Sequence, residues 1–332
     1  MHPLEILAHR GTHVESRHRV HVAVVDPAGQ LVARSGDPTF PTFLRSAAKP
    51  FQAWPVVTDG AADAFGLTTE ELALACASHN SERVHVHHVT ALLARAGLTE
   101  ADLACGGHRP LWRELAVSLP HEAEPEAVPQ TAVASNCSGK HAAMLILARH
   151  RQWPTAGYQQ LTHPVQLRGR VAVAHWAGLQ PDDIGLAVDG CGVACFQVPL
   201  AAMAGAFARF GTSDDPAAKR LADAMTAHPY LVGGLGRLDT ALLNAGAGRI
   251  LSKVGADGVY GVALRDRGLG IAVKVEDGHA RASMVALMAT LAFLEVPAAA
   301  DPALARFTQF TLRNTRGEPV GSLTAAGTLA RV

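Results

Sequence analysis

The chain is organised around the stretch Arg45-Ser46-Ala47-Ala48-Lys49-Pro50. Ser46 and Lys49 are three residues apart at the predicted start of a helix, and positions i and i+3 share one helix face. A serine becomes a nucleophile when a base takes its proton, and a lysine whose proton is loosely held can be that base. Pro50 favours the first helical turn, where its missing N–H costs nothing. The pattern predicts a Ser–Lys pair in one pocket, although S-x-x-K alone is also common on solvated surfaces.

The composition excludes several classes of partner. The chain has 332 residues, of which 48% are hydrophobic, with 29 basic and 29 acidic side chains. A net charge near zero argues against nucleic acid or an anionic membrane as the main partner. Aromatic residues make up only 5%, which argues against a surface that stacks nucleic-acid bases. We therefore expect no nucleic-acid partner and no membrane partner.

The cysteines and the first residues bear on the cellular compartment. The segment Met1 to Thr12 lacks the apolar region of a secretory signal. Five cysteines are present, and an odd number without a signal segment indicates reduced thiols. We expect a cytoplasmic protein.

Strand patterns lie at both ends of the chain, and helical patterns dominate its middle. Residues 19–34 alternate around a Pro/Gly turn and predict a hairpin, as do residues 259–264 with 269–275. A strongly apolar helix is predicted over 281–294, and a short buried strand over 184–188. This order predicts an α/β (α+β) fold with a mainly antiparallel sheet built from both chain ends and flanked by helices. We expect one catalytic unit over residues 1–332, with a sheet lobe at about 1–60 and 183–332 and an inserted helical lobe at about 61–182.

Two further motifs strengthen the prediction that the Ser–Lys stretch is catalytic. Ser78-His79-Asn80 ends a predicted helix, and Lys253-x-Gly255 precedes a predicted strand. S-x-x-K, S-x-N and K-x-G in this order are typical of serine acyl-transfer enzymes of the β-lactamase and penicillin-binding type. The second hydroxyl relays a proton to the leaving group, and the second lysine keeps the first amine deprotonated. Ser78-His79-Asn80 alone is also consistent with an ordinary helix C-terminal turn.

Two small-residue turns each hold a cysteine. Cys137 opens a helix that also carries Lys140 and His141, and Cys191 follows a strand. Buried free thiols behave as small hydrophobic groups, which is one interpretation. The other is that the two cysteines converge as ligands of a soft metal. The stretch 234–239 lacks the third glycine of a dinucleotide-binding loop, so we do not predict a nucleotide there.

Taken together, five motifs resemble the Rhizobium etli-type L-asparaginases, also called the asparaginase II family. They are Arg45-Ser46-Ala47-Ala48-Lys49-Pro50-Phe51-Gln52, Ala77-Ser78-His79-Asn80-Ser81-Glu82, Asn136-Cys137-Ser138-Gly139-Lys140-His141, Asp189-Gly190-Cys191-Gly192 and Lys253-x-Gly255-Ala256. The resemblance covers nearly the whole chain. It implies a fold similar to serine β-lactamases and glutaminases. It also implies an intracellular homodimer that hydrolyses the small molecule L-asparagine to L-aspartate and ammonia.

The resemblance also assigns site residues. It implies two Ser–Lys pairs, Ser46 with Lys49 and Ser78 with Lys253, and we expect Ser46 to attack the side-chain amide with Lys49 as base. It implies a zinc ion near the substrate, held by Cys137, Lys140 and Cys191. The residues expected around the amino-acid head group are Arg45, His141 and Asp189, with Asp239 where some family members have a third cysteine. That replacement leaves the strength of the metal site open.

Three alternatives remain from the sequence. A glutaminase or β-lactam-type hydrolase would use the same scaffold, because one methylene in a pocket is worth only about 1–3 kcal/mol. In a zinc-dependent amidase, Cys137 and Cys191 would hold the catalytic metal. A non-catalytic amino-acid-binding or zinc-sensing protein would keep the pocket without turnover.

Overall fold

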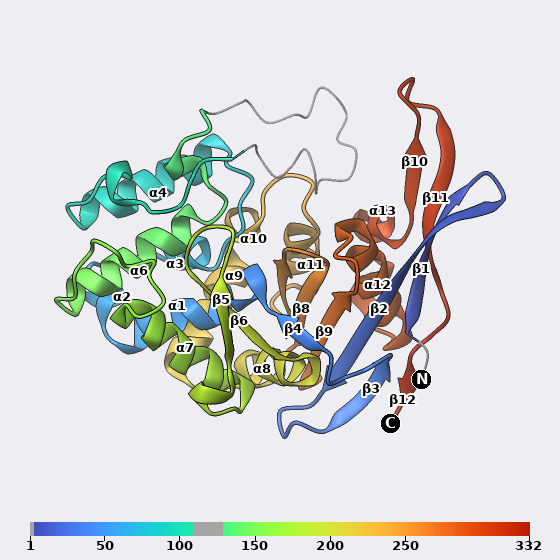
Figure 1. Cartoon of the computed structure of the whole chain (residues 1–332), viewed down its shortest axis with the longest axis horizontal. Helices are drawn as coiled ribbons and strands as arrows, with labels where there is room; N and C mark the ends of the chain where they lie inside the picture. The colour runs from blue at the N-terminus through green and yellow to red at the C-terminus, as the bar shows by residue number, and fades with distance from the viewer. Residues whose placement is uncertain (1–2, 109–128) are drawn as a thin grey trace.

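The computed structural model describes residues 3–108 and 129–332. A large antiparallel sheet crosses the molecule in the order β10-β11-β1-β2-β9-β8-β7, with β3 paired to β2 and β12 paired to β3 (Figure 1). Its strands come from both chain ends, so the predicted fold class is confirmed. The bounds are β1 Leu4–Arg10, β2 His13–Val25, β3 Leu31–Ser35, β7 Ile250–Gly255, β8 Val259–Leu264, β9 Leu269–Val275, β10 Phe310–Arg313, β11 Pro319–Ala326 and β12 Ala330–Arg331.

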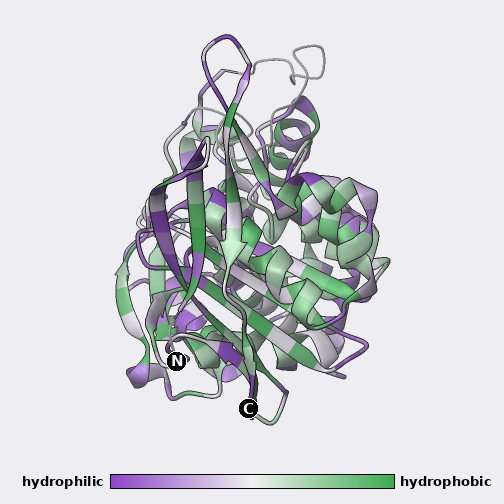
Figure 2. Ribbon diagram, turned by 90° about the vertical axis from the view of Figure 1, so that its right-hand side faces the viewer, coloured by the Kyte–Doolittle hydropathy of each residue, from purple (hydrophilic) through white to green (hydrophobic). Residues whose placement is uncertain are grey.

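Helices cover both faces of this sheet. α8 (Leu200–Thr212) packs on β2, β8 and β9, and α12 (Ala280–Phe293) lies against the opposite face. The alternation of β2 explains the two layers, because Ala23 and Val25 belong to the core beneath α8 while Val22 and Val24 belong to the core beneath α12. Figure 2 shows hydrophobic residues concentrated where strands and helices meet in the interior. Both faces of the sheet are therefore buried.

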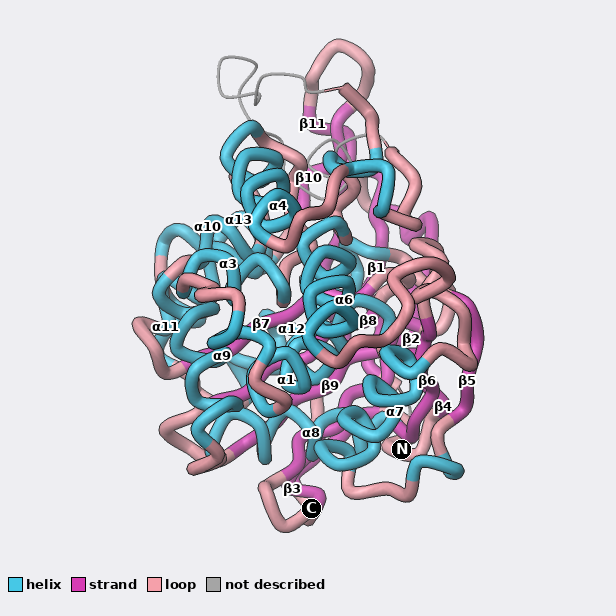
Figure 3. The backbone as a smooth tube through the Cα atoms, turned by 90° about the vertical axis from the view of Figure 1, so that its left-hand side faces the viewer, coloured by secondary structure: helices cyan, strands magenta, loops and turns pink. Residues whose placement is uncertain are grey.

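A helical region lies beside the sheet and supplies one wall of the site (Figures 1 and 3). α1 contacts α6, α7 and α9, and α3 contacts α4, α6 and α9. α1 and α9 thus join this region from outside the predicted range 61–182. The bounds are α1 Lys49–Thr58, α2 Ala61–Ala64, α3 Thr69–Ala75, α4 Arg83–Arg95, α6 Ser138–His150, α7 Pro164–Ala177, α9 Pro216–Ala227, α10 Pro229–Val232, α11 Leu238–Gly246 and α13 Ala305–Thr308.

A second, three-stranded sheet joins the two regions in the order β4-β6-β5. Its strands are β4 (Pro41–Phe43), β5 (Gly185–Val188) and β6 (Ala194–Pro199). The prediction of a buried strand at 184–188 was wrong in one respect. β5 is an edge strand, and Val188 is 64% exposed. The apolar residues of β5 predicted burial, but an edge position is decided by tertiary pairing that a short apolar run does not reveal.

None of the helices in the part of the chain that the structure describes combines the length and apolar character needed to cross a bilayer.

Candidate active site

A cavity of about 480 Å³ lies between the helical region and the end of β7. Segments far apart in the chain form its walls. They are the start of the helix that carries Ser46, the turn after the third helix at Ser78, the loop before α6, the turn after β5, and the turn after β7. The lining residues on which the chemistry depends are Arg45, Ser46, Ser78, Cys137, Asp189, Cys191, Arg237 and Asp257.

The Ser46 stretch begins with a strained residue. Arg45 has a φ of +50°, a left-handed conformation that costs energy for a residue with a Cβ. A short 3-10 helix, η1 (Arg45–Ala48), follows and leads into α1, where Pro50 occupies the first turn as predicted. Leu44 is fixed to the three-stranded sheet by its N–H, which donates to the carbonyl of Phe196 at 2.9 Å. The stretch therefore enters the cavity at a defined angle, with Ser46 half-buried in its wall.

Lys49 reaches a different serine from the one the spacing predicted. Its amine donates to Ser78 Oγ at 2.9 Å, to the carbonyl of Ala77 at 2.5 Å and to the carbonyl of Asn136 at 3.3 Å. Among the described residues, no side-chain hydrogen bond joins Ser46 to Lys49. The direct Ser46–Lys49 contact expected from the i, i+3 spacing is thus not made. The chain turns from a 3-10 helix into an α-helix between the two residues, and the long side chain of Lys49 extends into the protein interior.

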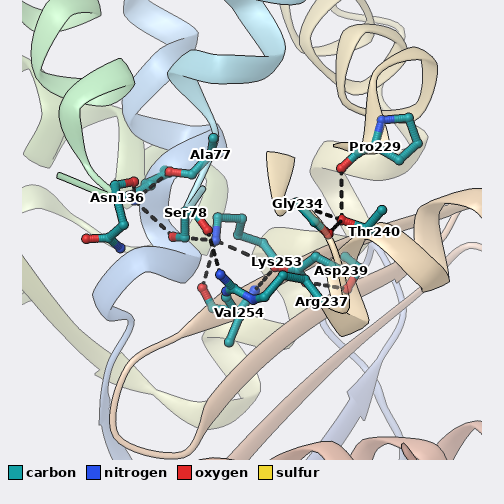
Figure 4. A network of polar contacts seen from close by, with 12 residues as sticks. Ala77, Ser78, Asn136, Pro229, Gly234, Arg237, Asp239, Thr240, Lys253 and Val254 are labelled. Atoms are coloured by element: carbon teal, nitrogen blue, oxygen red, sulfur yellow. Dashed lines mark hydrogen bonds and ion pairs between the residues drawn. The ribbon is translucent and has the colours of Figure 1, made fainter. Parts of the chain in front are cut away.

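Ser78 lies between two lysines. Lys253 on β7 donates to Ser78 Oγ at 2.8 Å, as the predicted pairing required (Figure 4). Lys49 approaches the same oxygen from α1. Ser78 is 1% exposed, and both lysines are fully buried. The strand, the helix and the turn after α3 (Thr69–Ala75) therefore meet at one hydroxyl group.

The surroundings of both amines favour their neutral form. Burial lowers the pKa of Lys49, because an ammonium group is costly to remove from water. Burial also lowers the pKa of Lys253 to about 7; the carboxylate of Asp239 opposes this shift, and the charge of Lys49 adds to it. Near neutral pH, a proton can therefore pass between these amines and Ser78.

Asp239 supports Lys253 on the side away from the cavity. Asp239 accepts hydrogen bonds from Ser252 Oγ at 2.8 Å and from the N–H of Val254 at 3.1 Å, and its carboxylate lies 3.8 Å from the Lys253 amine. It is buried behind the cavity rather than among the lining residues described above. Its role at the substrate head group stays a prediction.

Sequence reasoning missed Arg237. Its guanidinium donates to the carbonyl of Ser78 at 3.0 Å and to Asn80 Oδ1 at 3.1 Å, and it is 2% exposed. The signal available was the glycine-rich stretch 234–239, which the sequence analysis considered only as a nucleotide loop.

Arg45 carries an ion-pair cluster at the cavity mouth. Its Nε donates to Asp189 Oδ1 at 2.6 Å, and its Nη1 pairs with Asp257 on the turn after β7. Gly255 brings β7 close to the Ser46 stretch, since a Cβ there would lie 2.7 Å from the carbonyl oxygen of Leu44. Arg45 and Asp189 are thus brought together at the predicted head-group site, and Asp257 was not predicted.

The predicted metal ligands lie in one wall of the cavity. Cys137 and Cys191 both line this wall. The Lys140 amine lies 3.1 Å from Cys191 Sγ, and the Cys191 thiol lies 3.7 Å from Asp189 Oδ2. A hydrogen bond from Cys191 lowers the pKa of Cys137 well below its usual value, and the same bond raises the pKa of Cys191. Burial disfavours the charge of Lys140, but the sulfurs of Cys191 and Cys137 outweigh it and raise its pKa. Two soft donors and an amine are therefore in mutual contact.

His141 lies next to this group but inside the protein. The hydroxyl of Tyr158 accepts a hydrogen bond from the N–H of Ala104 at 2.9 Å, so its own proton is donated to His141 Nδ1 at 2.6 Å. Burial lowers the pKa of His141 to about 3, which keeps the ring neutral. Its Nε2 is buried and has no hydrogen-bond partner in residues 3–108 and 129–332. The position of His141 at the substrate head group stays a prediction.

With this geometry in place, comparison with known proteins is informative. The model of the family described as L-asparaginase II matches residues 6–325. The chain belongs to the L-asparaginase II family. This match confirms the resemblance seen in the five motifs. A comparison with curated protein sequences gives no match.

Two solved structures are distantly similar to this family member. One is Mglu in its native form, with 17% identity and a TM-score of 0.43, covering 79% of this chain and 60% of that chain. The chain therefore spans less than two thirds of the length of that protein. The other is a β-lactamase from Mycobacterium bovis, with 18% identity and a TM-score of 0.39, covering 87% of this chain and 95% of that chain.

Proposed function

We propose that this protein is an L-asparaginase, which hydrolyses L-asparagine to L-aspartate and ammonia through a serine acyl-enzyme. The observation that carries the proposal is Ser78 held between two lysine amines at 2.9 Å and 2.8 Å, at a cavity whose wall also bears Ser46. The family membership supports the amide substrate.

Ser46 is the nucleophile in this proposal, because it is the more exposed of the two serines. Its hydroxyl would attack the side-chain carbonyl carbon of L-asparagine. Its proton would reach Lys49 through one bridging water, because no hydrogen bond joins the two side chains in the part of the chain that the structure describes. The N–H of Ser46, at the start of η1, would donate to the oxyanion. Water then attacks the acyl carbon and releases L-aspartate.

Ser78 relays the proton. A nearly inaccessible hydroxyl that contacts two amines is poorly placed to attack a substrate but can accept a proton on one side while donating one on the other. It would carry the proton from Lys49 to the departing ammonia, and the neutral amine of Lys253 would accept the Ser78 proton during this transfer. The lowered pKa values of both lysines support this role.

Zinc is part of the proposal as a group that anchors the substrate. Residues 3–108 and 129–332 contain no cluster of three or more His, Cys, Asp or Glu side chains arranged for a metal. The expected set has two cysteines and a lysine, and their mutual contacts fit zinc, which favours thiolate ligands. Cys137, Cys191 and Lys140 would hold the ion, whose positive charge would displace the proton that the two sulfurs otherwise keep on Lys140. When bound, zinc would supply positive charge near the α-carboxylate.

An ammonia-release assay tests the function. We expect the wild type to release ammonia from L-asparagine, with a much weaker reaction on L-glutamine and no hydrolysis of a β-lactam. Ser46→Ala should abolish turnover, since losing one member of a unit that acts together costs several orders of magnitude. Near-wild-type turnover by Ser46→Ala would refute the nucleophile assignment. A rise in melting temperature with L-asparagine but no ammonia would indicate a binding protein instead.

The cytoplasmic location and the homodimer expected from the family belong to the same proposal. Light scattering on the purified protein tests the dimer, and a monomer mass would contradict it.

A further inference from the structure

Asp257 lies on the turn between β7 and β8, at the mouth of the cavity. Its backbone has a φ of +54°, a conformation that residues other than Gly, Asn and Asp rarely adopt. The amine of Lys274 on β9 donates to the carbonyl of Asp257 at 2.7 Å and fixes the turn to the sheet. The turn is thus held in one conformation, and that conformation brings the carboxylate to Arg45.

The two carboxylates on Arg45 differ in how firmly they are held. Asp189 has a side chain that is 8% exposed, and its Oδ1 accepts from Arg45 Nε and also from the N–H of Gly190 at 2.9 Å. The side chain of Asp257 is 67% exposed. In the described part of the chain, its carboxylate bonds only to Arg45. An exposed ion pair of this kind contributes little net stability, because water and salt compete for both charges. Arg45 can therefore release Asp257 at low cost.

We propose that Asp257 is a substrate-binding residue that selects the α-ammonium group of the substrate. The α-carboxylate of L-asparagine takes the place of Asp257 on Arg45, and the released Asp257 carboxylate accepts the α-ammonium group together with Asp189. One ion pair at the mouth, Arg45 with Asp257, is thereby exchanged for three. The inference rests on the proposed asparaginase function and extends it to the recognition of the head group.

This exchange distinguishes free amino acids from their deaminated analogues. Succinamate has the amide and the carboxylate of L-asparagine but no α-ammonium group. Its carboxylate can displace Asp257 from Arg45, but the displaced Asp257 then has no cation to bind. We therefore expect the wild type to prefer L-asparagine to succinamate, and this preference to shrink when Asp257 is replaced.

Asp257→Asn tests the inference without disturbing the turn, since asparagine tolerates the left-handed conformation. Asp266→Asn is the matched control, because Asp266 is exposed on the neighbouring turn between β8 and β9. We expect Asp257→Asn to raise KM for L-asparagine by about tenfold to a hundredfold, the equivalent of one charge-assisted hydrogen bond. We expect kcat and the kinetics with succinamate to change little, and Asp266→Asn to behave as the wild type.

Binding measurements separate this inference from the proposed function. Calorimetry in the Ser46→Ala background compares L-aspartate with succinate, with and without Asp257→Asn. Weaker binding of L-aspartate alone supports the inference even if the wild type releases no ammonia, in which case only the proposed function falls. Equal effects on both ligands, or no effect on L-aspartate, overturn the inference even if the wild type is an active asparaginase. No binding of L-aspartate to the protein that retains Asp257 would overturn the inference, while ammonia release alone decides the proposed function.

Discussion

Ser78→Ala removes the hydroxyl group that joins the two lysine amines. Lys49 keeps the carbonyls of Ala77 and Asn136 as acceptors, and Lys253 keeps the carbonyl of Val254 at 2.9 Å. Neither amine is left without a hydrogen bond. The cost to the free energy of unfolding should therefore be about 1 kcal/mol, the value of an ordinary hydrogen bond.

The effect on turnover should be much larger than the effect on stability. A positioned acid–base group contributes about 10²–10⁴-fold to the rate. Ser78 is the only hydroxyl group with hydrogen bonds to both lysines in the described part of the chain. We therefore expect kcat for L-asparagine to fall by about 10²–10⁴-fold, the full contribution of that group.

Ammonia release and urea unfolding measure the two quantities on the same preparations. Ser35→Ala is the control, since Ser35 is also fully buried and its hydroxyl accepts the N–H of Leu4 at 2.6 Å, on a strand remote from the cavity. We expect Ser35→Ala to lower the free energy of unfolding by about 1–3 kcal/mol, because it leaves a buried donor unpaired. Its turnover at a temperature where it is folded should match the wild type.

Two results would refute this reasoning. One is a folded Ser78→Ala variant that keeps turnover within tenfold of the wild type, because the relay would then be unnecessary. The other is an acyl group found on Ser78 by mass spectrometry after brief mixing with L-asparagine, because Ser78 would then be the nucleophile. An acyl group on Ser46 that accumulates in Ser78→Ala is the expected result.

Three further perturbations test the surroundings of this centre. The activity of the wild type should rise with pH through an apparent pKa of about 7, because only the neutral amine of Lys253 accepts a proton. Asp239→Asn should move this rise in activity to lower pH, because it removes the carboxylate that raises the pKa of Lys253. A pH–rate profile of kcat checks both, and a limb that moves upward would contradict the assignment. Cys191→Ser, or a chelator, should lower the zinc content measured by atomic absorption. The same change should raise KM for L-asparagine more than it lowers kcat, and a loss of kcat alone would indicate a metal that activates water. Gly255→Ala should reduce kcat and stability together, because its Cβ would lie 2.7 Å from the carbonyl oxygen of Leu44 and must displace β7 or the Ser46 stretch. A wild-type melting temperature and wild-type turnover would show that the close contact between Gly255 and Leu44 is unimportant.

Local patterns predicted much of the fold. The strands β8 and β9 have the predicted bounds, because their apolar residues are bounded by a clear turn. Thr68 and Glu71 form a capping box at the start of α3, and such a box is a local sequence signal for the start of a helix. The strands β1, β4, β6, β7, β10, β11 and β12 were not predicted. Most of them are short or amphipathic, and several pair with strands far away in the chain.

The sequence by itself determined which residue types this protein brings to its chemistry and in what order. The motifs at Ser46, Ser78 and Lys253 indicated two serines and their lysines, because each short motif can be recognised from a few neighbouring residues. Only the tertiary structure decided which amine contacts which hydroxyl. Lys49 lies three residues from Ser46, yet its amine binds Ser78, 29 residues away in the chain. The path of a long buried side chain is set by packing and by carbonyl acceptors from other segments, and neither is encoded in the spacing. The same reason explains why Asp257 became visible as a partner of Arg45 only after the chain had folded.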